Sequence, residues 1–332
     1  MAGRRTNLAL LLLVPAAVLT GGLTFLVGSG PVAPVVVAHG VVGVALLVLS
    51  PWKATVARRG LRRRRPGRRL SLALTALVLL ALVSGLAHST GTLLDAGPVT
   101  AMQVHVAAAV GALVLTAAHV RRRRTRPRSA DLSRRSLLRA GVLALAAAGA
   151  YAALEGAAAV LALPGATRRA TGSYEVSSLV PTGMPVTSWL LDAVPPADPA
   201  TWTVAVASAG VVRHWSVDEL RATGDRASVV LDCTGGWWSR QEWSGTRLSR
   251  LLPAGATGSV QVVSRTGYRR RLPLTDDLLL AVDVGGAPLS SGHGAPVRLV
   301  VPDRRGYHWV KWVDRVEHDQ RPWWQQPPLP LR

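Results

Sequence analysis

The segment of residues 291–312 reads SGHGAPVRLVVPDRRGYHWVKW and carries the strongest structural signal in the chain. Short apolar runs alternate in it with Gly, Pro and basic residues, which is typical of β-strands joined by tight loops. Such loops present His293, Arg298 and Lys311 to an anionic ligand that accepts many hydrogen bonds. A guanidinium can bind a phosphate group through two parallel hydrogen bonds, whereas an ammonium acts as a point charge. The segment therefore predicts a β-rich domain that binds a phosphate-bearing ligand.

A second unusual segment, residues 230–238 (VLDCTGGWW), contains the only cysteine of the chain. A strand is expected to run into a Gly-Gly turn here, with Cys233 at the junction. A lone cysteine is most often a small buried hydrophobe, and spacing alone favours that interpretation. The polar, glycine-rich surroundings favour the alternative that a loop thiolate ligates a soft metal. One cysteine excludes an intrachain disulfide and a metal site built from several cysteines.

The rest of the C-terminal half has the same β-rich pattern from residue 165 onward, and its length suffices for one domain with its own core. A short helix is expected at Ser216–Ala222, where Ser216 and Glu219 can form a capping box. Ten of the eleven Trp lie in this half, and we expect some of them to line a cleft. The predicted strands are Thr201–Ala207, Ser228–Leu231, Ser259–Ser264, Leu278–Val284, Val297–Val301 and His308–Val313.

Two segments, Leu231–Trp243 and His293–Trp312, together resemble the oxidoreductase molybdopterin-binding domain of the sulfite oxidase superfamily. This superfamily includes sulfite oxidases, plant-type nitrate reductases and the catalytic subunit of the periplasmic protein-methionine-sulfoxide reductase. The resemblance covers residues 175–320. It implies a sulfite-oxidase-like α+β, β-rich domain that binds Mo-molybdopterin, in which Cys233 binds molybdenum through its thiolate.

The same resemblance implies how the pterin is held. The residues that match the family's pterin contacts are His293, Arg298, Trp309, Val310, Lys311 and, more weakly, Thr266. His293 and Arg298 match positions that contact the phosphate, and Lys311 belongs to the second pterin-binding loop. Cys233 would be a permanent ligand that tunes the metal, because the protein supplies position and electrostatics to cofactor chemistry.

The chain also departs from the family. It has no motif of the soluble haem domain of animal sulfite oxidases, and no counterpart of the dimerisation domain that usually follows is expected. The active-site arginines of sulfite oxidases cannot be placed by motif, since Arg240 and Arg265 only lie near the matching segments. The substrate is therefore left open between a small molecule and a methionine-sulfoxide-type group.

The first half of the chain differs from the second in its charge distribution. The 332 residues are 49% hydrophobic yet carry 39 Lys+Arg against 18 Asp+Glu, a net charge of +21. Residues 1–139 hold 20 basic and 2 acidic side chains, so +18 of the +21 lies there. Because these charges cluster between long uncharged runs, they exclude a single soluble core and argue against nucleic-acid binding.

The uncharged runs predict five membrane-spanning helices, each with the roughly 20 residues that cross the hydrocarbon core. They are Leu8–Val27, Val32–Ser50, Leu70–His88, Thr100–Val120 and Ala140–Leu163. Arg-rich connections at residues 51–70 and 121–136 alternate with connections that contain no basic residue. Positively charged loops stay inside, so the N-terminus is expected in the cytoplasm and the C-terminal half outside the cell membrane.

Residues 133–139, SRRSLLR, precede the fifth apolar run and resemble a twin-arginine export signal. Signals of this type serve proteins that fold around a cofactor before they are exported. Two further cytoplasmic arginines are the simpler alternative. We expect an uncleaved anchor, because the apolar run is longer than the core of a usual cleaved signal.

Four histidines, His39, His88, His105 and His119, lie within the predicted spans or at their edges. Polar side chains are costly in a bilayer and by default mark a site. The predicted topology places His39, His88 and His105 near the outer side, where two imidazoles can bind the iron of a haem b. His119, 14 residues after His105, is the candidate for a second haem but lacks a partner on the inner side. Hydrogen bonding between helices is the alternative role.

The sequence thus predicts three parts: a four-span membrane domain (1–132) with a candidate haem b site, a twin-arginine-like signal anchor that forms the fifth span (133–164), and an extracytoplasmic molybdopterin-binding oxidoreductase domain (165–332). The fold class is an all-α transmembrane bundle followed by an α+β domain. We expect a membrane-anchored molybdenum oxidoreductase that transfers an oxygen atom and exchanges electrons with a quinone or respiratory-chain partner. The alternatives are a metal-free binding or assembly module and a cytochrome-type electron carrier.

Overall fold

The computed structural model describes residues 2–27, 32–62, 67–96, 99–122, 128, 131, 133–189 and 192–330. The chain divides into two units. The first, here called the helical unit, contains residues 1–25 and 30–172, and the second, the sheet unit, contains residues 26–29 and 173–332. The turn at Pro164–Thr167 packs against the helices at Arg68–Thr90 and Arg134–Val160 and therefore belongs to the helical unit, which ends at Gly172.

Within the described residues, five long helices make up most of the helical unit: α1 (Ala2–Leu26), α2 (Ala33–Arg62), α3 (Arg68–Thr90), α4 (Ala101–Arg122) and α5 (Arg134–Val160). All five are long and apolar enough to cross a membrane, which confirms the predicted number of such helices. A hairpin of β1 (Asp95–Ala96) and β2 (Val99–Thr100) precedes α4. Large apolar side chains such as Leu12, Leu145 and Val160 stay exposed, as expected of helices that face lipid.

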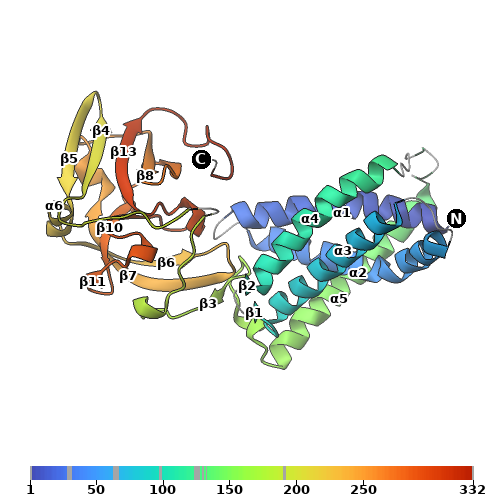
Figure 1. Ribbon diagram of the computed structural model, residues 1–332. Helices are drawn as coiled ribbons and strands as arrows, with labels where there is room; N and C mark the ends of the chain where they lie inside the picture. The colour runs from blue at the N-terminus through green and yellow to red at the C-terminus, as the bar shows by residue number, and fades with distance from the viewer. Residues whose placement is uncertain are drawn as a thin grey trace. The chain divides into compact units, whose positions relative to one another are not determined.

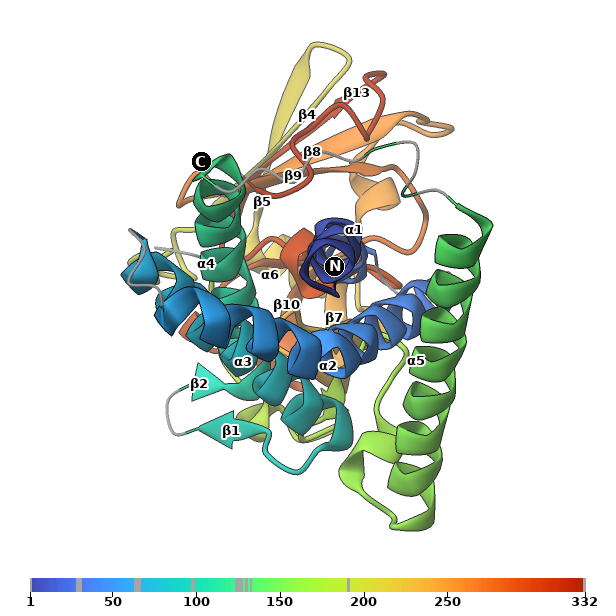
Figure 2. The same cartoon turned by 90° about the vertical axis from the view of Figure 1, so that its right-hand side faces the viewer.

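The helices of this unit pack in pairs. α3 runs along α4, and α2 packs on α5 (Figure 2). A Cβ atom on Gly111 of α4 would lie 3.1 Å from Cδ1 of Leu77 on α3. The ring of Tyr151 on α5 fills the space that a Cβ on Gly40 of α2 would need. Glycines therefore let the helix backbones approach each other, as is common between membrane helices.

The sheet unit contains two β-sheets (Figure 1). The first sheet is built on β7 and β10, which pair with each other; β7 also pairs with β3 and β6, and β10 with β11 and β12. Its strands are β3 (Tyr174–Glu175), β6 (Asp225–Asp232), β7 (Trp237–Arg247), β10 (Leu279–Val284), β11 (Ala287–Pro288) and β12 (Arg298–Val300).

The second sheet has the strand order β5–β4–β13–β8–β9. Its neighbours are antiparallel except β4 and β13, which are parallel. The strands are β4 (Thr203–Ser208), β5 (Val211–Ser216), β8 (Ser259–Ser264), β9 (Arg269–Pro273) and β13 (Val313–Asp319).

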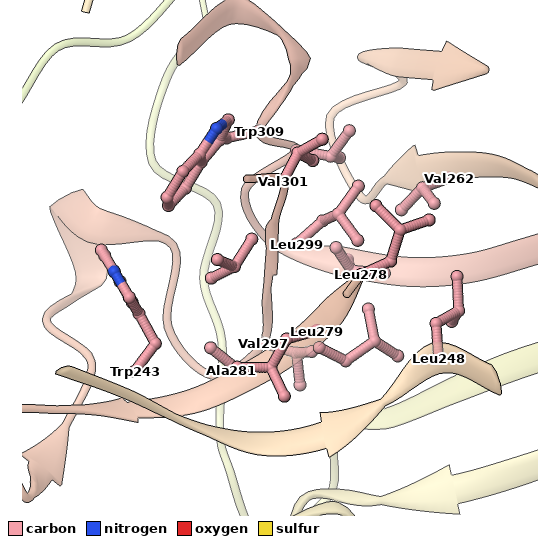
Figure 3. Close-up of a cluster of buried hydrophobic side chains, with 14 of the residues drawn as sticks. Trp243, Leu248, Val262, Leu278, Leu279, Ala281, Val297, Leu299, Val301 and Trp309 are labelled. Atoms are coloured by element: carbon pink, nitrogen blue, oxygen red, sulfur yellow. The ribbon is translucent and has the colours of Figure 1, made fainter. Parts of the chain in front are cut away.

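Strand β7 illustrates how side-chain alternation builds the first sheet. Trp237, Ser239, Gln241 and Trp243 point to the buried face, whereas Arg240 and Glu242 are exposed. Successive side chains of a strand face opposite sides, so this spacing buries every second residue. The buried face of β7 joins a core of Val and Leu side chains from β8, β10 and β12 (Figure 3). The rings of Trp243 and Trp309 meet edge to face there, with centroids 5.5 Å apart.

Most of the predicted local elements are present. β4, β6, β8, β10 and β12 overlap their predicted ranges. Helix α6 (Val217–Ala222) follows Ser216, whose Oγ accepts a hydrogen bond from the N–H of Glu219 while the Glu219 carboxylate accepts one from the N–H of Ser216. This is the predicted capping box.

The strand predicted at His308–Val313 is wrong. Residues Gly306–His308 form a 3-10 turn, and β13 begins only at Val313. The N–H groups of His308 and Trp309 donate to the carbonyl oxygens of Arg305 and Gly306, which closes the turn. Trp312 then adopts a left-handed backbone with φ of 50°. The aromatic and apolar residues of this segment therefore belong to a loop.

Gly245→Ala is expected to destabilise the sheet unit strongly. A Cβ at this position would collide with the carbonyl oxygen of Leu280 and lie 2.9 Å from Cα of Ala281, and paired backbone cannot move aside. We expect a loss of about 2–3 kcal/mol in the free energy of unfolding. Tryptophan fluorescence during thermal unfolding measures it, because ten of the eleven Trp lie in this unit.

The matched control is Gly255→Ala. Nothing lies within 4 Å of the Cβ position of Gly255, so only its left-handed backbone, with φ of 70°, opposes the change. This strain costs about 1 kcal/mol. Equal losses in the two variants would show that the β7–β10 approach is not the constraint.

Candidate active site

Cys233 directly follows β6, at the tip of the β6–β7 hairpin. Its N–H donates to the carbonyl oxygen of Trp237 at 2.8 Å, and its own carbonyl accepts from the N–H of Gly236 at 3.2 Å. Gly236 has a φ of 91°, a conformation that side chains rarely adopt. The Gly-Gly turn of the sequence therefore holds the thiol at a defined point beyond the strand end.

The Cys233 side chain is buried, with 7% of the residue exposed. The N–H of Gly235 donates to its Sγ at 3.3 Å. Burial raises the pKa of the thiol, while the hydrogen bonds from Gly235 and from the hydroxyl of Thr187 oppose that rise. Arg305 lowers this pKa and Asp232 raises it. The metal-free protein therefore carries a protonated thiol at neutral pH, and a metal that binds there displaces the proton.

Arg298 opens β12 and is a buried cation with 3% of the residue exposed. Its Cζ lies 5.4 Å from the ring centroid of Trp243 and 5.3 Å from that of Trp309. Nη1 donates to the carbonyl oxygen of His293 at 3.0 Å, whereas Nε has no hydrogen-bond partner in the described part of the chain. Burial lowers the pKa of Arg298 to about 10, so it remains charged at neutral pH.

Lys311 supplies a second positive charge. Its Nζ donates to the carbonyl oxygen of Gly292 at 2.5 Å. Burial and, next, the charge of Arg298 lower the pKa of Lys311 to about 7. Asp192, which lines the same pocket as Lys311, opposes this lowering, but among the described residues no carboxylate forms a salt bridge with either cation. Buried charges are normally paired, so the buried Arg298 in particular favours an anionic ligand.

His293 lies in the loop that leads to Arg298, and the hydrogen bonds of its ring hold this loop in place. Its Nε2 lies 3.1 Å from the carbonyl oxygen of Met184, to which it donates, and its Nδ1 lies 2.8 Å from Oγ of Ser290. Burial, followed by the charges of Arg298 and Lys311, lowers the pKa of His293 and keeps the ring neutral. Because both ring nitrogens have protein partners, a contact of this ring with phosphate stays a prediction.

These side chains meet in one pocket of the sheet unit. The predicted site residues that line it are Cys233, His293, Arg298, Trp309 and Lys311. Val310 is fully buried behind the pocket, where its carbonyl accepts from the N–H of Leu299 at 2.8 Å. Thr266 lies outside the lining, with Oγ1 3.0 Å from Oγ of Ser264.

One wall of the pocket is formed by residues that were not predicted from the sequence. It consists of Pro185, Thr187, Ser188, Trp189 and Asp192. The indole N–H of Trp237 donates to Oγ1 of Thr187 at 3.3 Å, and the Trp189 ring packs edge-on against Tyr268 with centroids 6.3 Å apart. The only available signal for this wall was the excess of Trp, which predicted a cleft without locating it. Arg240 and Arg265 do not line the pocket.

The sheet unit is similar in sequence to known proteins. Residues 192–326 match the family described as Oxidoreductase molybdopterin binding domain. The chain is 31% identical over 169 residues to the nitrate reductase [NAD(P)H] of Hordeum vulgare, covering 37% of this chain and 19% of that one. It is 29% identical over 163 residues to the mitochondrial sulfite oxidase of Rattus norvegicus, covering 37% of this chain and 30% of the relative.

Among solved structures, the sulfane dehydrogenase SoxCD from Paracoccus pantotrophus aligns with a TM-score of 0.36 and 22% identity, over 39% of this chain and 40% of that one. The chain spans less than a third of the length of the two curated relatives. The sheet unit is thus an oxidoreductase molybdopterin-binding domain. Its similarity to nitrate reductase and sulfite oxidase supports membership of the sulfite oxidase superfamily.

The pocket fits Mo-molybdopterin by the chemistry of its lining. Arg298 and Lys311 suit the phosphate group, the Cys233 thiolate suits a soft metal, and the aromatic rings suit a flat pterin. The unpartnered Nε of the buried Arg298 is the observation that carries this fit. No group of three His, Cys, Asp or Glu side chains among the described residues could hold a metal ion. A metal bound to Cys233 therefore takes further ligands from the cofactor.

The structure brings together two of the four histidines of the helical unit. The rings of His39 on α2 and His105 on α4 have centroids 6.0 Å apart and planes at 85°. His88, near the end of α3, uses Nε2 in a hydrogen bond of 2.8 Å with the carbonyl oxygen of Gly172. His119 lies in the last turn of α4, 14 residues beyond His105.

Lys311→Met is expected to stabilise the cofactor-free protein at pH 6 and to weaken cofactor retention. The pKa of Lys311 is about 7 in the fold against an ordinary 10.5, so the unfolded chain binds this proton more tightly. The resulting penalty is complete below pH 7 and disappears as the pH rises to 10.5. We expect a gain of about 1–3 kcal/mol at pH 6 that shrinks toward pH 10.

Tryptophan fluorescence during unfolding at the two pH values measures this gain. Arg315→Met is the control, because Arg315 is an exposed cation paired with Glu317 on β13. Its effect should stay within about 0.5 kcal/mol. A gain for Lys311→Met that does not change with pH would contradict the assignment of a buried, uncompensated charge.

Proposed function

We propose that the chain is a membrane-anchored, molybdopterin-dependent oxidoreductase that transfers an oxygen atom to or from a small molecule or a methionine-sulfoxide-type group. The observation that carries this proposal is the convergence of a buried thiol, the buried guanidinium of Arg298 and the half-buried ammonium of Lys311 in one pocket. Neither feature stabilises the protein by itself, because uncompensated buried charge is unfavourable. Both become favourable when a metal cofactor with a phosphate group is bound.

In this proposal each group of the pocket has a separate task. Cys233 holds the metal through its thiolate, and the N–H of Gly235 donates to that sulfur and lowers its proton affinity. Arg298 and Lys311 hold the phosphate, and Trp309 covers Arg298 from water. When bound, the molybdenum cofactor supplies two-electron redox chemistry and oxygen-atom transfer.

The helical unit is proposed to anchor the protein in the cell membrane. Five helices of sufficient length and hydropathy support insertion. The Arg-rich connections favour a cytoplasmic N-terminus and an extracytoplasmic sheet unit. The twin-arginine-like residues 133–139 lead into α5, whose 27 residues exceed the core of a usual cleaved signal and so support an uncleaved anchor. Electrons would then pass between the sheet unit and a quinone or respiratory-chain partner through the membrane.

Cys233→Ser is expected to lower the molybdenum content of the purified protein at least about tenfold, because a hydroxyl is a poor ligand for a soft metal. Elemental analysis measures the content, and tryptophan fluorescence checks that the variant is folded. Thr266→Ala is the control, since Thr266 lies outside the pocket lining. Wild-type metal content in the serine variant would remove the ligand role. A wild-type protein without molybdenum would favour the metal-free binding module.

For the electron path we propose one haem b held between α2 and α4 by His39 and His105. The two rings come from different helices and lie with their centroids 6.0 Å apart, so they would hold the haem iron together. Glycines lie beside both rings: a Cβ on Gly21 would lie 3.0 Å from Cε1 of His39, and one on Gly85 would lie 2.8 Å from Nδ1 of His105.

The hydrogen bonds of the two rings favour iron ligation through Nε2. Nδ1 of His105 lies 2.7 Å from the carbonyl oxygen of Ala81, which can only accept, so Nδ1 carries the proton. Nδ1 of His39 lies 3.1 Å from Oγ1 of Thr20, whose own hydrogen is donated to the carbonyl oxygen of Ala16. In both rings the hydrogen bond is thus made by Nδ1. An imidazole that donates from one nitrogen keeps the lone pair of the other for a metal.

His39→Ala and His105→Ala are each expected to abolish the b-type absorbance of reduced, purified protein, because each removes one axial ligand. His119→Ala and His88→Ala are the matched controls and should keep it, since Nε2 of His88 is engaged by the carbonyl oxygen of Gly172 and His119 lies 14 residues beyond His105 on α4. Absence of a b-type spectrum from the wild-type protein would exclude the haem. A spectrum lost equally in all four variants would contradict the assigned pair.

A further inference from the structure

An ion pair lies directly behind the Cys233 loop. Nη1 of Arg305 is 2.5 Å from Oδ1 of Asp232, and their side chains are 4% and 8% exposed. It is the most deeply buried ion pair among the described residues. Such pairs gain little net stability, because two charges must be removed from water to form them. The position of the pair therefore needs another explanation.

The pair joins the two segments that build the pocket. Asp232 ends β6 and precedes Cys233, while Arg305 precedes the turn that leads to Trp309 and Lys311. The backbones of Asp232 and Arg305 also form a parallel bridge. A Cβ on Gly306 would lie 3.4 Å from Cα of Cys233, so the two segments are in contact.

The uncharged hydroxyl of Ser173 forms hydrogen bonds with both members of the ion pair. Its Oγ donates to Oδ1 of Asp232 at 2.7 Å, and Nη1 of Arg305 lies 3.3 Å from the same Oγ. The carboxylate, the guanidinium and the hydroxyl are all buried. Their mutual orientation is therefore fixed, and within the pair the Asp232 carboxylate neutralises the Arg305 guanidinium.

The balance matters because other charges already lie beside the sulfur. Arg298 and Lys311 line the same pocket as Cys233, and so does the Asp192 carboxylate, which raises the pKa of Lys311. In dry surroundings a full charge a few ångströms away acts strongly on a thiolate and on a metal bound to it. Asp232 and Arg305 act on the Cys233 sulfur with opposite signs.

We propose that Asp232 and Arg305 are positioning residues that fix the Cys233 loop and keep the net charge behind its sulfur at zero, thereby setting the reduction potential of the metal. This inference rests on the proposed molybdenum ligation by Cys233. Removing a negative charge near a metal favours its reduced state, and removing a positive charge favours its oxidised state. The two residues therefore have opposite effects on the potential.

The test uses the full-length, cofactor-loaded protein and three variants: Asp232→Asn, Arg305→Gln and the double variant. The midpoint potential of the molybdenum centre is measured by redox titration followed by electron paramagnetic resonance. We expect it to rise in Asp232→Asn, to fall in Arg305→Gln and to return to the wild-type value in the double variant. Molybdenum content is measured on the same samples.

The matched control is Asp319→Asn. It breaks the ion pair of Arg271 with Asp319, which is 2.5 Å long and joins β9 to β13 outside the pocket lining. This variant should lower the temperature of unfolding and leave the potential unchanged. A purely structural role of Asp232 and Arg305 would give them the same behaviour as this control.

The outcomes separate this inference from the function on which it rests. A wild-type protein without molybdenum refutes the proposed function. A loaded wild-type protein whose potential is unchanged in both single variants, or shifts in the same direction in both, overturns the charge-balance role. If a single variant fails to load, the double variant decides, because it keeps the site neutral: loading with a wild-type potential supports the inference, and failure to load overturns it.

Discussion

Two positive charges that are largely removed from water determine what the pocket can bind. The Arg298 guanidinium is buried and the Lys311 ammonium is half-buried, and carbonyl oxygens and the Asp192 carboxylate compensate their lost hydration only in part. Apolar side chains of the same size would give a more stable empty fold. The arrangement becomes favourable once an anion binds, because the phosphate of the cofactor compensates the charge of the two cations. The Trp243–Trp309 pair and the His293 loop keep these charges away from water.

Much of the site could be predicted because its chemistry is local in the chain. The strand before Cys233 and the two glycines after it drew attention to this residue, and these signals act over a few residues, but its role as a metal ligand was implied only by the family resemblance. Arg298 and Lys311 stood out against Gly, Pro and short apolar runs in the same way. The wrong strand at His308–Val313 has a local cause as well. Aromatic and apolar alternation predicts a strand, yet Trp309 and Lys311 reach the pocket only because the chain turns at Gly306–His308.

Contacts between distant segments could not be predicted. Thr187 meets Trp237 across 50 residues, and Asp232 meets Arg305 across 73. Nothing near Asp232 in the sequence distinguishes a buried carboxylate from an exposed one, since charged residues are exposed in most cases. The helical unit shows the same limit. Five apolar helices could be recognised by length and composition, but only their packing selects two facing imidazoles from four histidines.

The two kinds of charge in the sheet unit differ in one respect, and this difference separates their roles. Arg298 and Lys311 face the pocket and form no salt bridge with a described carboxylate, although Asp192 in the same lining raises the pKa of Lys311. Arg305, behind the same cysteine, is paired with Asp232. If the fold merely tolerated buried arginines, both groups would be expected to have partners. The charges that face the ligand are therefore available to bind it, and the charge behind the metal-binding sulfur is paired within the protein. Removing Arg298 or Lys311 should therefore weaken binding of the anion. Removing one member of the Asp232–Arg305 pair should instead shift the reduction potential of the metal.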